Sequence, residues 1–125
     1  MPYTLLIFCG AGLGGIARYW LSNGIYWLFG RQFPYGTLVV NTTGCFLIGL
    51  LFALIVDRFA DIAPQLRALL IIGFLGGYTT FSSFSIETIN LFEMGAWING
   101  TINVVANVAL SITLTWLGIL IGRQL

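Results

Sequence analysis

The residues best suited to chemistry lie in one polar, glycine-rich segment, residues 76–85, which reads Gly-Gly-Tyr-Thr-Thr-Phe-Ser-Ser-Phe-Ser. It interrupts a hydrophobic stretch in which a membrane helix should continue. Hydrocarbon holds no water for exposed backbone groups, so irregular backbone at that depth must be buried by protein or line a polar cavity. Gly76 and Gly77 are expected to adopt dihedrals that a helix does not use. Freed carbonyl oxygens would suit a small hard cation. The segment predicts an ion site or a pore; a kink closed by its own hydroxyls is the alternative.

Two phenylalanines follow the interruption, and an earlier segment carries an amide of complementary character. Phe81 and Phe84 are three residues apart and therefore share a helix face. The positive edge of a phenyl ring can solvate a small anion, although packing against lipid or other helices is the ordinary role of such a pair. Asn41 lies about one turn into its own apolar segment. Its NH₂ group donates, which suits either a permeating anion or another helix.

A regular polar series lies in the last apolar segment. Its members recur every four residues and are Asn99, Asn103, Asn107, Ser111 and Thr115. This spacing makes a slowly winding stripe on one helix face. Hydrogen bonding between helices is the alternative role of such residues. The length of the series favours a wet or pore-facing surface.

Two ionisable residues fall inside apolar segments and are functional candidates for that reason. Glu87 follows the interruption by two turns and shares the Phe81–Phe84 face by spacing, which favours a position facing a vestibule. Arg18 lies in the second half of the first segment. For either residue, the alternative is a position near the membrane interface, toward which its side chain extends.

The elements that must position these residues are four membrane-spanning helices in a single domain, residues 1–125. The chain is 58% hydrophobic and 7% charged, which no soluble domain of this size would sustain. A spanning helix needs about 20 mostly apolar residues. We expect helices over about 3–28, 37–56, 65–92 with a break near 76–80, and 97–122. Gly10 and Gly14 have the GxxxG spacing that lets helix backbones approach closely in lipid.

The arginines mark the orientation of this bundle only weakly. Four spans place Arg58, Arg67 and Arg123 on one side of the membrane, and Arg31, with or without Arg18, on the other. Lys/Arg asymmetry is what fixes orientation. The sequence is therefore compatible with insertion both ways, which gives antiparallel dimers, or with one modestly favoured orientation. Four helices leave little interior for a transport path, so we expect a homodimer.

Several functional classes are disfavoured. The net charge is +1, with no basic patch for nucleic acid. The chain has no histidine, no serine paired with a plausible base and no Walker-type phosphate loop, so an enzyme is not expected. Cys9 and Cys45 lie in apolar segments without ligand spacing. We interpret them as helix-packing residues rather than a disulfide or transition-metal site.

Three ordered motifs make the chain similar to a known family. They are Gly14 to Arg18 (G-x-x-x-R, followed by Tyr19-Trp20), residues 36–41 (Gly-Thr-Leu-Val-Val-Asn) and residues 76–87, which end in Glu87. Together they resemble the Fluc, or CrcB-type, fluoride channels. The resemblance covers nearly the whole chain, with matching length and four-span layout.

The resemblance implies an antiparallel, dual-topology homodimer with two fluoride pores and a central structural sodium ion. The sodium ligands would be the carbonyls of Gly76 and Thr79 from each subunit. The pore residues that it implies are Asn41, Phe81, Ser82, Ser83, Phe84, Asn107, Ser111 and Thr115. From their positions inside spans, we add Glu87 to the expected pore residues and place Arg18 in a vestibule. Ser83 stands where threonine is common. Asn107 stands where family members carry other polar or aromatic side chains.

By this resemblance, the expected function is passive export of cytoplasmic fluoride across the inner membrane of a bacterium, which protects against fluoride toxicity. A small multidrug-type exporter is the main alternative, since those are also four-span, dual-topology dimers. They need a carboxylate in the first span, where this chain offers only Arg18. A non-transporting membrane subunit would explain the glycines but not the polar series of the last segment.

Overall fold

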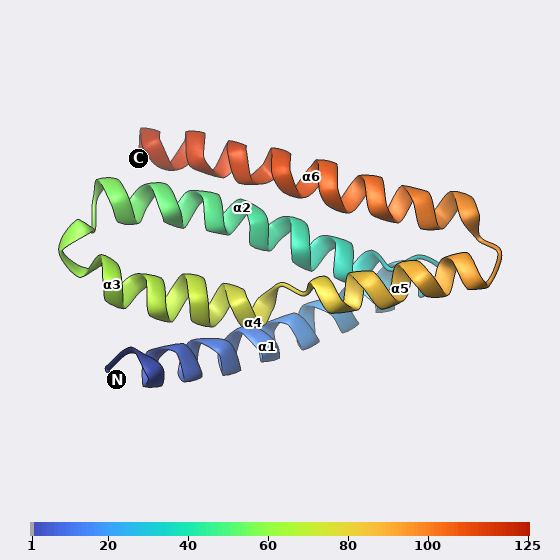
Figure 1. Ribbon diagram of the computed structural model, residues 1–125, viewed down its shortest axis with the longest axis horizontal. Helices are drawn as coiled ribbons and strands as arrows, with labels where there is room; N and C mark the ends of the chain where they lie inside the picture. Colours follow the sequence, from blue (N-terminus) through green and yellow to red (C-terminus); the bar gives the residue numbers. More distant parts are fainter. Residues whose placement is uncertain (1) are drawn as a thin grey trace.

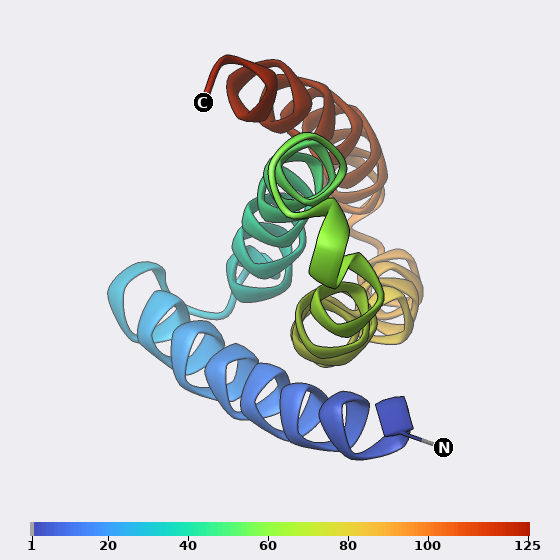
Figure 2. The same cartoon turned by 90° about the vertical axis from the view of Figure 1, so that its left-hand side faces the viewer.

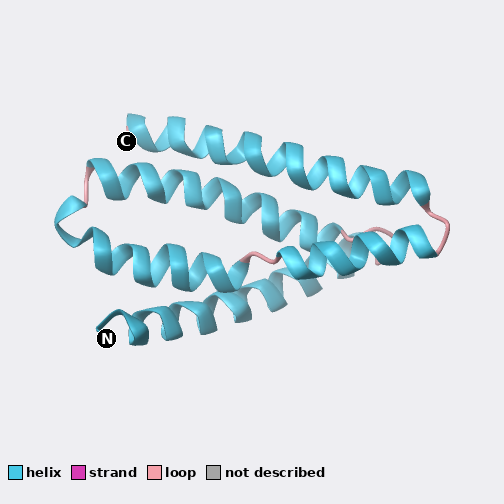
Figure 3. Ribbon diagram, in the orientation of Figure 1, coloured by secondary structure: helices cyan, strands magenta, loops and turns pink. Residues whose placement is uncertain are grey.

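The computed structural model describes residues 2–125, whose regular elements are all helices; these residues contain no strand. In chain order the elements are α1 (Pro2–Phe29), α2 (Tyr35–Asp57), η1 (Ala60–Ile62), α3 (Ala63–Leu66), η2 (Arg67–Leu75), α4 (Gly76–Tyr78), α5 (Phe81–Glu93) and α6 (Trp97–Gln124). They form four elongated rods joined by short turns (Figure 1, Figure 3). The expectation of an all-helical chain is confirmed.

Each rod is long and apolar enough to cross a membrane. The four candidate spans are Tyr3–Phe29, Tyr35–Asp57, Ala60–Glu93 and Trp97–Gln124. At 1.5 Å per residue, the 28 residues of α1 reach about 42 Å, beyond the hydrocarbon core of about 30 Å. Large apolar side chains such as Trp27 and Ile98 are mostly exposed, as suits a surface that faces lipid. The chain is a multi-pass membrane protein.

The helices run alternately up and down. Both termini and the turn between α2 and α3 lie at one end (Figure 1). Figure 2 shows that α1 and α6 occupy opposite sides, with α2 and the third rod between them. The main packing partners are α2 with α6, and α1 with η2, a π-helical stretch.

Glycines permit the closest of these contacts. A Cβ on Gly10 or Gly14 would collide with the backbone of η2, so the GxxxG expectation for α1 is confirmed. On the other pair, a Cβ on Gly49 or Gly118 would collide with the facing backbone of α6 or α2. Close backbone approach replaces the hydrophobic drive that lipid does not supply.

The third rod is interrupted at Thr79 and Thr80, which have extended backbone with φ/ψ of −83°/156° and −149°/116°. The expectation for the glycines was wrong. Gly76 is helical, with φ −61° and ψ −37°, and Gly77 lies within α4. A Cβ on Gly77 would collide with the backbone of Ala11, so this glycine serves close packing against α1.

Candidate functional site

Asn41 of α2 holds the interrupted backbone through a reciprocal pair of hydrogen bonds. Its Nδ2 donates to the Thr80 carbonyl at 2.9 Å, and the Thr80 N–H donates to its Oδ1 at 2.8 Å. An amide side chain pairs with one peptide group in this way as a neighbouring strand would. One N–H of Asn41 is therefore engaged, and the second is left for another acceptor.

Thr80 also begins α5. Its Oγ1 accepts from the Ser83 N–H at 3.1 Å, as a threonine N-cap does, and donates to Ser83 Oγ at 3.1 Å. The Ser82 hydroxyl lies 3.2 Å from the same oxygen. Thr80 is one of the hydroxyls expected to bond to backbone groups freed by the break, but its role as the N-cap of α5 was not predicted.

The same bonds release two backbone carbonyls. In a continuous helix, Gly76 O would accept from Thr80 N and Thr79 O from Ser83 N. Thr80 N donates to Asn41 instead, and Ser83 N donates to the Thr80 hydroxyl. These are the carbonyls expected to bind a cation, and oxygen donors of this kind fit a hard ion such as sodium.

Arg18 bonds to the carbonyl of Gly77, a residue that lies between Gly76 and Thr79 in the sequence. Its Nε donates to Gly77 O at 3.1 Å, across 59 residues of chain. A guanidinium suits the C-terminal end of a helical rod, where the helix dipole is negative. Arg18 therefore bonds to the interrupted rod instead of extending to the membrane interface.

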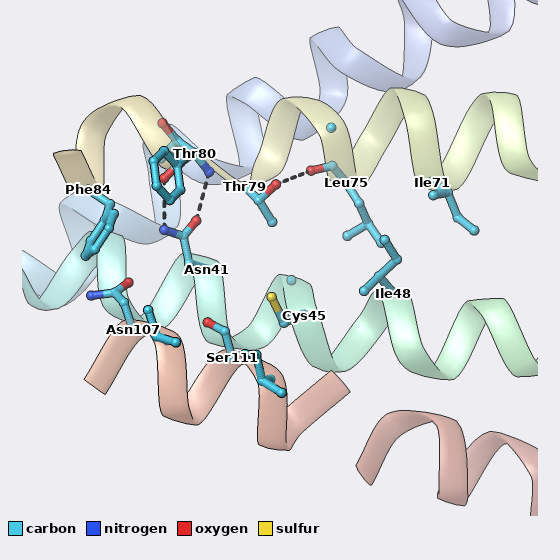
Figure 4. A pocket seen from close by; sticks show the side chains of 15 residues that line it. Asn41, Cys45, Ile48, Ile71, Leu75, Thr79, Thr80, Phe84, Asn107 and Ser111 are labelled. Atoms are coloured by element: carbon cyan, nitrogen blue, oxygen red, sulfur yellow. Dashed lines mark hydrogen bonds between the residues drawn. The ribbon is translucent and has the colours of Figure 1, made fainter. Parts of the chain in front are cut away.

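A cavity of about 410 Å³, here cavity 1, opens beside the interruption (Figure 4). Of the expected site residues, its wall includes Asn41, Gly76, Thr79, Phe81, Phe84, Asn107 and Ser111. Apolar residues such as Ile48, Ile71 and Leu75 complete it, and no ionisable Asp, Glu or Arg side chain lines it. The structure thus brings residues of α2, α4, α5 and α6 to one neutral cavity.

Phe81 and Phe84 contact each other at this wall. Their ring centroids are 5.3 Å apart with an interplanar angle of 61°, an edge-to-face arrangement. Phe84 is buried at 8% exposure, whereas Phe81 is 77% exposed. The shared face expected from the spacing is confirmed.

The polar series of α6 does not form one wet surface. Four-residue steps turn a helix by about 40° each, so the series winds by about 160° from Asn99 to Thr115. Asn99 is exposed and Asn103 is buried. Thr115 donates to Cys45 O at 3.1 Å and lines neither cavity described here. Hydrogen bonding between helices, the alternative for this series, describes Asn103 and Thr115.

Asn107 lines cavity 1 without offering a donor to it. Its Nδ2 donates to both oxygens of Asn103, to the backbone O at 2.8 Å and to Oδ1 at 2.9 Å. Its own Oδ1 is buried and accepts no hydrogen bond from the described residues. Ser111, one turn further, is the member of the series whose hydroxyl remains a candidate donor to the cavity.

The other side of α5 faces a second cavity of about 880 Å³, here cavity 2. Its lining includes Arg18, Ser22, Asn23, Tyr26, Thr37, Ser83 and Glu87. The expectation that Glu87 shares the Phe81–Phe84 face was wrong. Two three-residue steps turn the helix by about 120° away from Phe81, which places Glu87 toward α1.

Glu87 joins three helices. Its carboxylate accepts from the Tyr26 hydroxyl at 3.0 Å and from the Thr37 hydroxyl at 2.6 Å. Neither partner could be predicted from local sequence, because Tyr26 and Thr37 lie 61 and 50 positions away from Glu87 in the chain. Glu87 thus fastens α5 to α1 and α2.

The fold and the site define a class of protein. It is a small multi-pass membrane protein whose third rod is interrupted beside a cavity, and that cavity is lined by neutral side chains including two phenylalanines. The comparisons with known proteins agree. Residues 5–119 match the model of the family described as "CrcB-like protein, Camphor Resistance (CrcB)". The chain belongs to the CrcB-like family.

Curated relatives of high similarity carry one name, "Fluoride-specific ion channel FluC". The protein from Coxiella burnetii is 59% identical over 122 residues, 98% of each chain. Those from Citrifermentans bemidjiense and Geobacter sulfurreducens are 51% and 48% identical over 125 residues, the full length of both chains. This chain is therefore similar to these channels from end to end.

Proposed function

We propose that this protein is a fluoride channel that lets fluoride leave the cytoplasm passively. The observation that carries the proposal is the 59% identity to a fluoride-specific ion channel over 98% of both chains. The neutral lining of cavity 1 supports it. Fluoride holds its water tightly, so a pathway must replace water with dipoles while binding weakly enough for the ion to leave.

The proposed anion path runs along cavity 1. The second N–H of Asn41, the edges of Phe81 and Phe84 and the Ser111 hydroxyl are its neutral groups. Asn107 forms part of the wall without donating. The pore role of Ser82, Ser83 and Thr115 stays a prediction. Arg18 and Glu87 line cavity 2, where they bond to neighbouring helices.

Reconstitution in liposomes tests this function. Vesicles loaded with fluoride or with chloride are followed by ion-selective electrodes after a potential is imposed. We expect fast release of fluoride and little release of chloride. Fluoride release no faster than from protein-free vesicles would refute the proposal.

We further propose that two copies assemble as an antiparallel, dual-topology homodimer across the face that carries cavity 1. Phe81 is 77% exposed on that face, beside the neutral cavity that needs a cover. Arg58 and Arg67 lie at the connection between α2 and η2, Arg123 lies in the last turn of α6, and Arg31 lies in the turn between α1 and α2, which is a small asymmetry for setting orientation. Cysteine accessibility from both sides of sealed vesicles tests this. Labelling from one side alone would exclude dual topology.

The break in the third membrane helix is proposed to supply a sodium site at the dimer axis, from the carbonyls of Gly76 and Thr79 of each copy. These carbonyls have lost their helical partners and border cavity 1. A bound sodium ion would neutralise the inward carbonyl dipoles and add positive potential. Replacing sodium by N-methylglucamine should lower flux and dimer stability together. Unchanged values for both would remove the case for a bound ion.

The proposed setting is the inner membrane of a bacterium, because the relatives named above come from bacteria. Hydrofluoric acid enters from acid surroundings and ionises inside, and the negative membrane potential drives the anion outward. Growth in fluoride of a channel-deficient bacterium, with and without this gene, tests the protective role.

A further inference from the structure

We propose that Thr88 and Asn103 are positioning residues that fix the rotation of α5 and so hold the Phe84 ring in cavity 1. The effect that we expect on fluoride flux rests on the fluoride-channel function proposed above. The positioning of α5 by these hydrogen bonds does not depend on that function. Neither residue lines cavity 1, so both act through Phe84 rather than on an ion.

Packing alone gives α5 a weak hold. Among its residues only Phe84, Thr88 and Leu91 are buried. Lipid is as apolar as the other helices, so apolar contacts do not drive α5 against them as they would in water. Hydrogen bonds between helices therefore contribute much to holding α5 in its position. Between α5 and α6, the side-chain bond described in the structure is Asn103 to Thr88.

The direction of every bond in this network follows from its first member. Thr88 Oγ1 donates its one hydrogen to Phe84 O at 2.7 Å, so its oxygen is free only to accept. Asn103 must therefore turn its NH₂ to Thr88, which it does at 2.9 Å. This turns Asn103 Oδ1 toward Asn107, whose NH₂ donates to it at 2.9 Å.

The network has no alternative orientation of its amides. Flipping either asparagine would bring two carbonyl oxygens together or leave a buried NH₂ without an acceptor. The series ends at Asn107 Oδ1, which is buried and unpartnered in the described residues. An unpaired buried acceptor is unfavourable. Asn107 nevertheless keeps this orientation, because its NH₂ donates to Asn103, whose own amide is oriented by Thr88.

Asn103 is the central member, at 1% exposure. It ties α6 to the turn of α5 that follows Phe84. If that tie is lost, α5 can rotate about its axis between its remaining bonds to Asn41 and to the partners of Glu87. Rotation would carry the Phe84 ring edge away from cavity 1 and from its contact with Phe81.

Thr88→Val and Thr88→Ser form a matched pair, tested in the full chain in lipid vesicles. Valine keeps the shape and removes the hydroxyl, whereas serine keeps the hydroxyl. We expect fluoride efflux about tenfold slower in Thr88→Val, as for one lost buried hydrogen bond, and near wild-type efflux in Thr88→Ser. The ratio of fluoride to chloride flux should also fall only in Thr88→Val, which a mere loss of folded protein would not cause.

A second readout is independent of flux. With 4-fluorophenylalanine placed at position 84, the ¹⁹F resonance should shift or broaden in Thr88→Val and stay in place in Thr88→Ser. Thr88→Cys, a weak hydrogen-bonding partner, should be intermediate and keeps the test decisive if Thr88→Val does not assemble. An unchanged ¹⁹F spectrum in the valine or cysteine variant overturns the positioning role. If no variant, nor the wild type, carries fluoride, the channel function fails while the spectra still decide this proposal.

Discussion

The two sides of α5 present opposite kinds of polar group. The wall of cavity 1 is largely apolar, its polar side chains are neutral amides and hydroxyls, and no ionisable Asp, Glu or Arg lines it. Cavity 2, toward α1, contains Arg18 and Glu87. One helix therefore separates a neutral surface from a charged one. A full charge would bind a small ion too tightly to release it, whereas several weak dipoles would not.

The charges of cavity 2 are already engaged within the chain. Glu87 accepts from Tyr26 and Thr37, and Arg18 donates to Gly77 O. These bonds join α1 to both parts of the interrupted third rod and α2 to its second part, α5. The intramembrane charges thus have a structural use, while the neutral groups of cavity 1 keep spare capacity. Changes to cavity 1 should alter ion flux, and changes to cavity 2 should alter stability.

The largest effect is expected at the aromatic wall. Phe84→Ile removes a ring edge at a buried position and should slow fluoride efflux by about a hundredfold, equal to roughly 2.7 kcal/mol of barrier. Phe81→Ile should act in the same direction. Phe92→Ile is the control, since its ring packs on Trp97 at 5.1 Å, away from both cavities. Wild-type flux in the Phe84 and Phe81 variants would reduce the pair to packing residues.

A negative charge in cavity 1 should have the next largest effect. Asn41→Asp keeps the acceptor for Thr80 N, loses the donor to Thr80 O and adds a charge that repels an anion. We expect fluoride efflux to fall about tenfold, or by ~1.4 kcal/mol. Asn99→Asp adds the same charge at an exposed position of α6 and should leave efflux unchanged. Equal effects of the two variants would contradict a local role for cavity 1.

Arg18→Lys tests the bond between α1 and the interrupted rod. Lysine keeps the charge without the Nε donor, so the bond to Gly77 O should be lost at a cost of about 1.5 kcal/mol in stability. The measurement is the thermal unfolding of the protein in detergent. Arg123→Lys, at an exposed position in the last turn of α6, is the control. A stable Arg18 variant with altered ion selectivity would instead place Arg18 in the anion path.

The smallest effect is expected for Glu87→Gln. A neutral amide oxygen can still accept one hydroxyl, so Tyr26 or Thr37 loses its charged acceptor and stability should fall by about 1 kcal/mol. Fluoride efflux should change by less than about twofold, since Glu87 does not line cavity 1. Glu93→Gln, exposed at the end of α5, is the control. A large loss of flux with normal stability would show that the two cavities act together.

Local patterns in the sequence were enough for part of the site. Length and hydropathy indicated four spans, and the Phe81–Phe84 spacing predicted a shared face. GxxxG spacing predicted the close approach of α1. Each of these depends on helix geometry within a few residues, so periodicity alone can detect it.

Predictions that extended a three- or four-residue spacing over several turns were wrong because of angular drift. A step of three or four residues misses a full helical turn by tens of degrees, and the error accumulates. Glu87 therefore left the phenylalanine face, and the α6 series divided between solvent-exposed, buried and helix-contacting positions. The glycines of the interruption also had a different purpose, since Gly77 lies against Ala11 rather than in an unusual conformation.

By itself, the sequence determined that the chain has four apolar spans and that the third is interrupted within residues 76–85, because composition and short-range spacing set both. Only the tertiary structure decided which groups remain free. Asn41 accepts from Thr80 N and thereby releases Gly76 O, and Arg18 donates to Gly77 O. Asn103 accepts the NH₂ of Asn107, which therefore has no hydrogen left for the cavity. A hydrogen bond needs both partners in place, and those partners come from helices that are distant in the sequence.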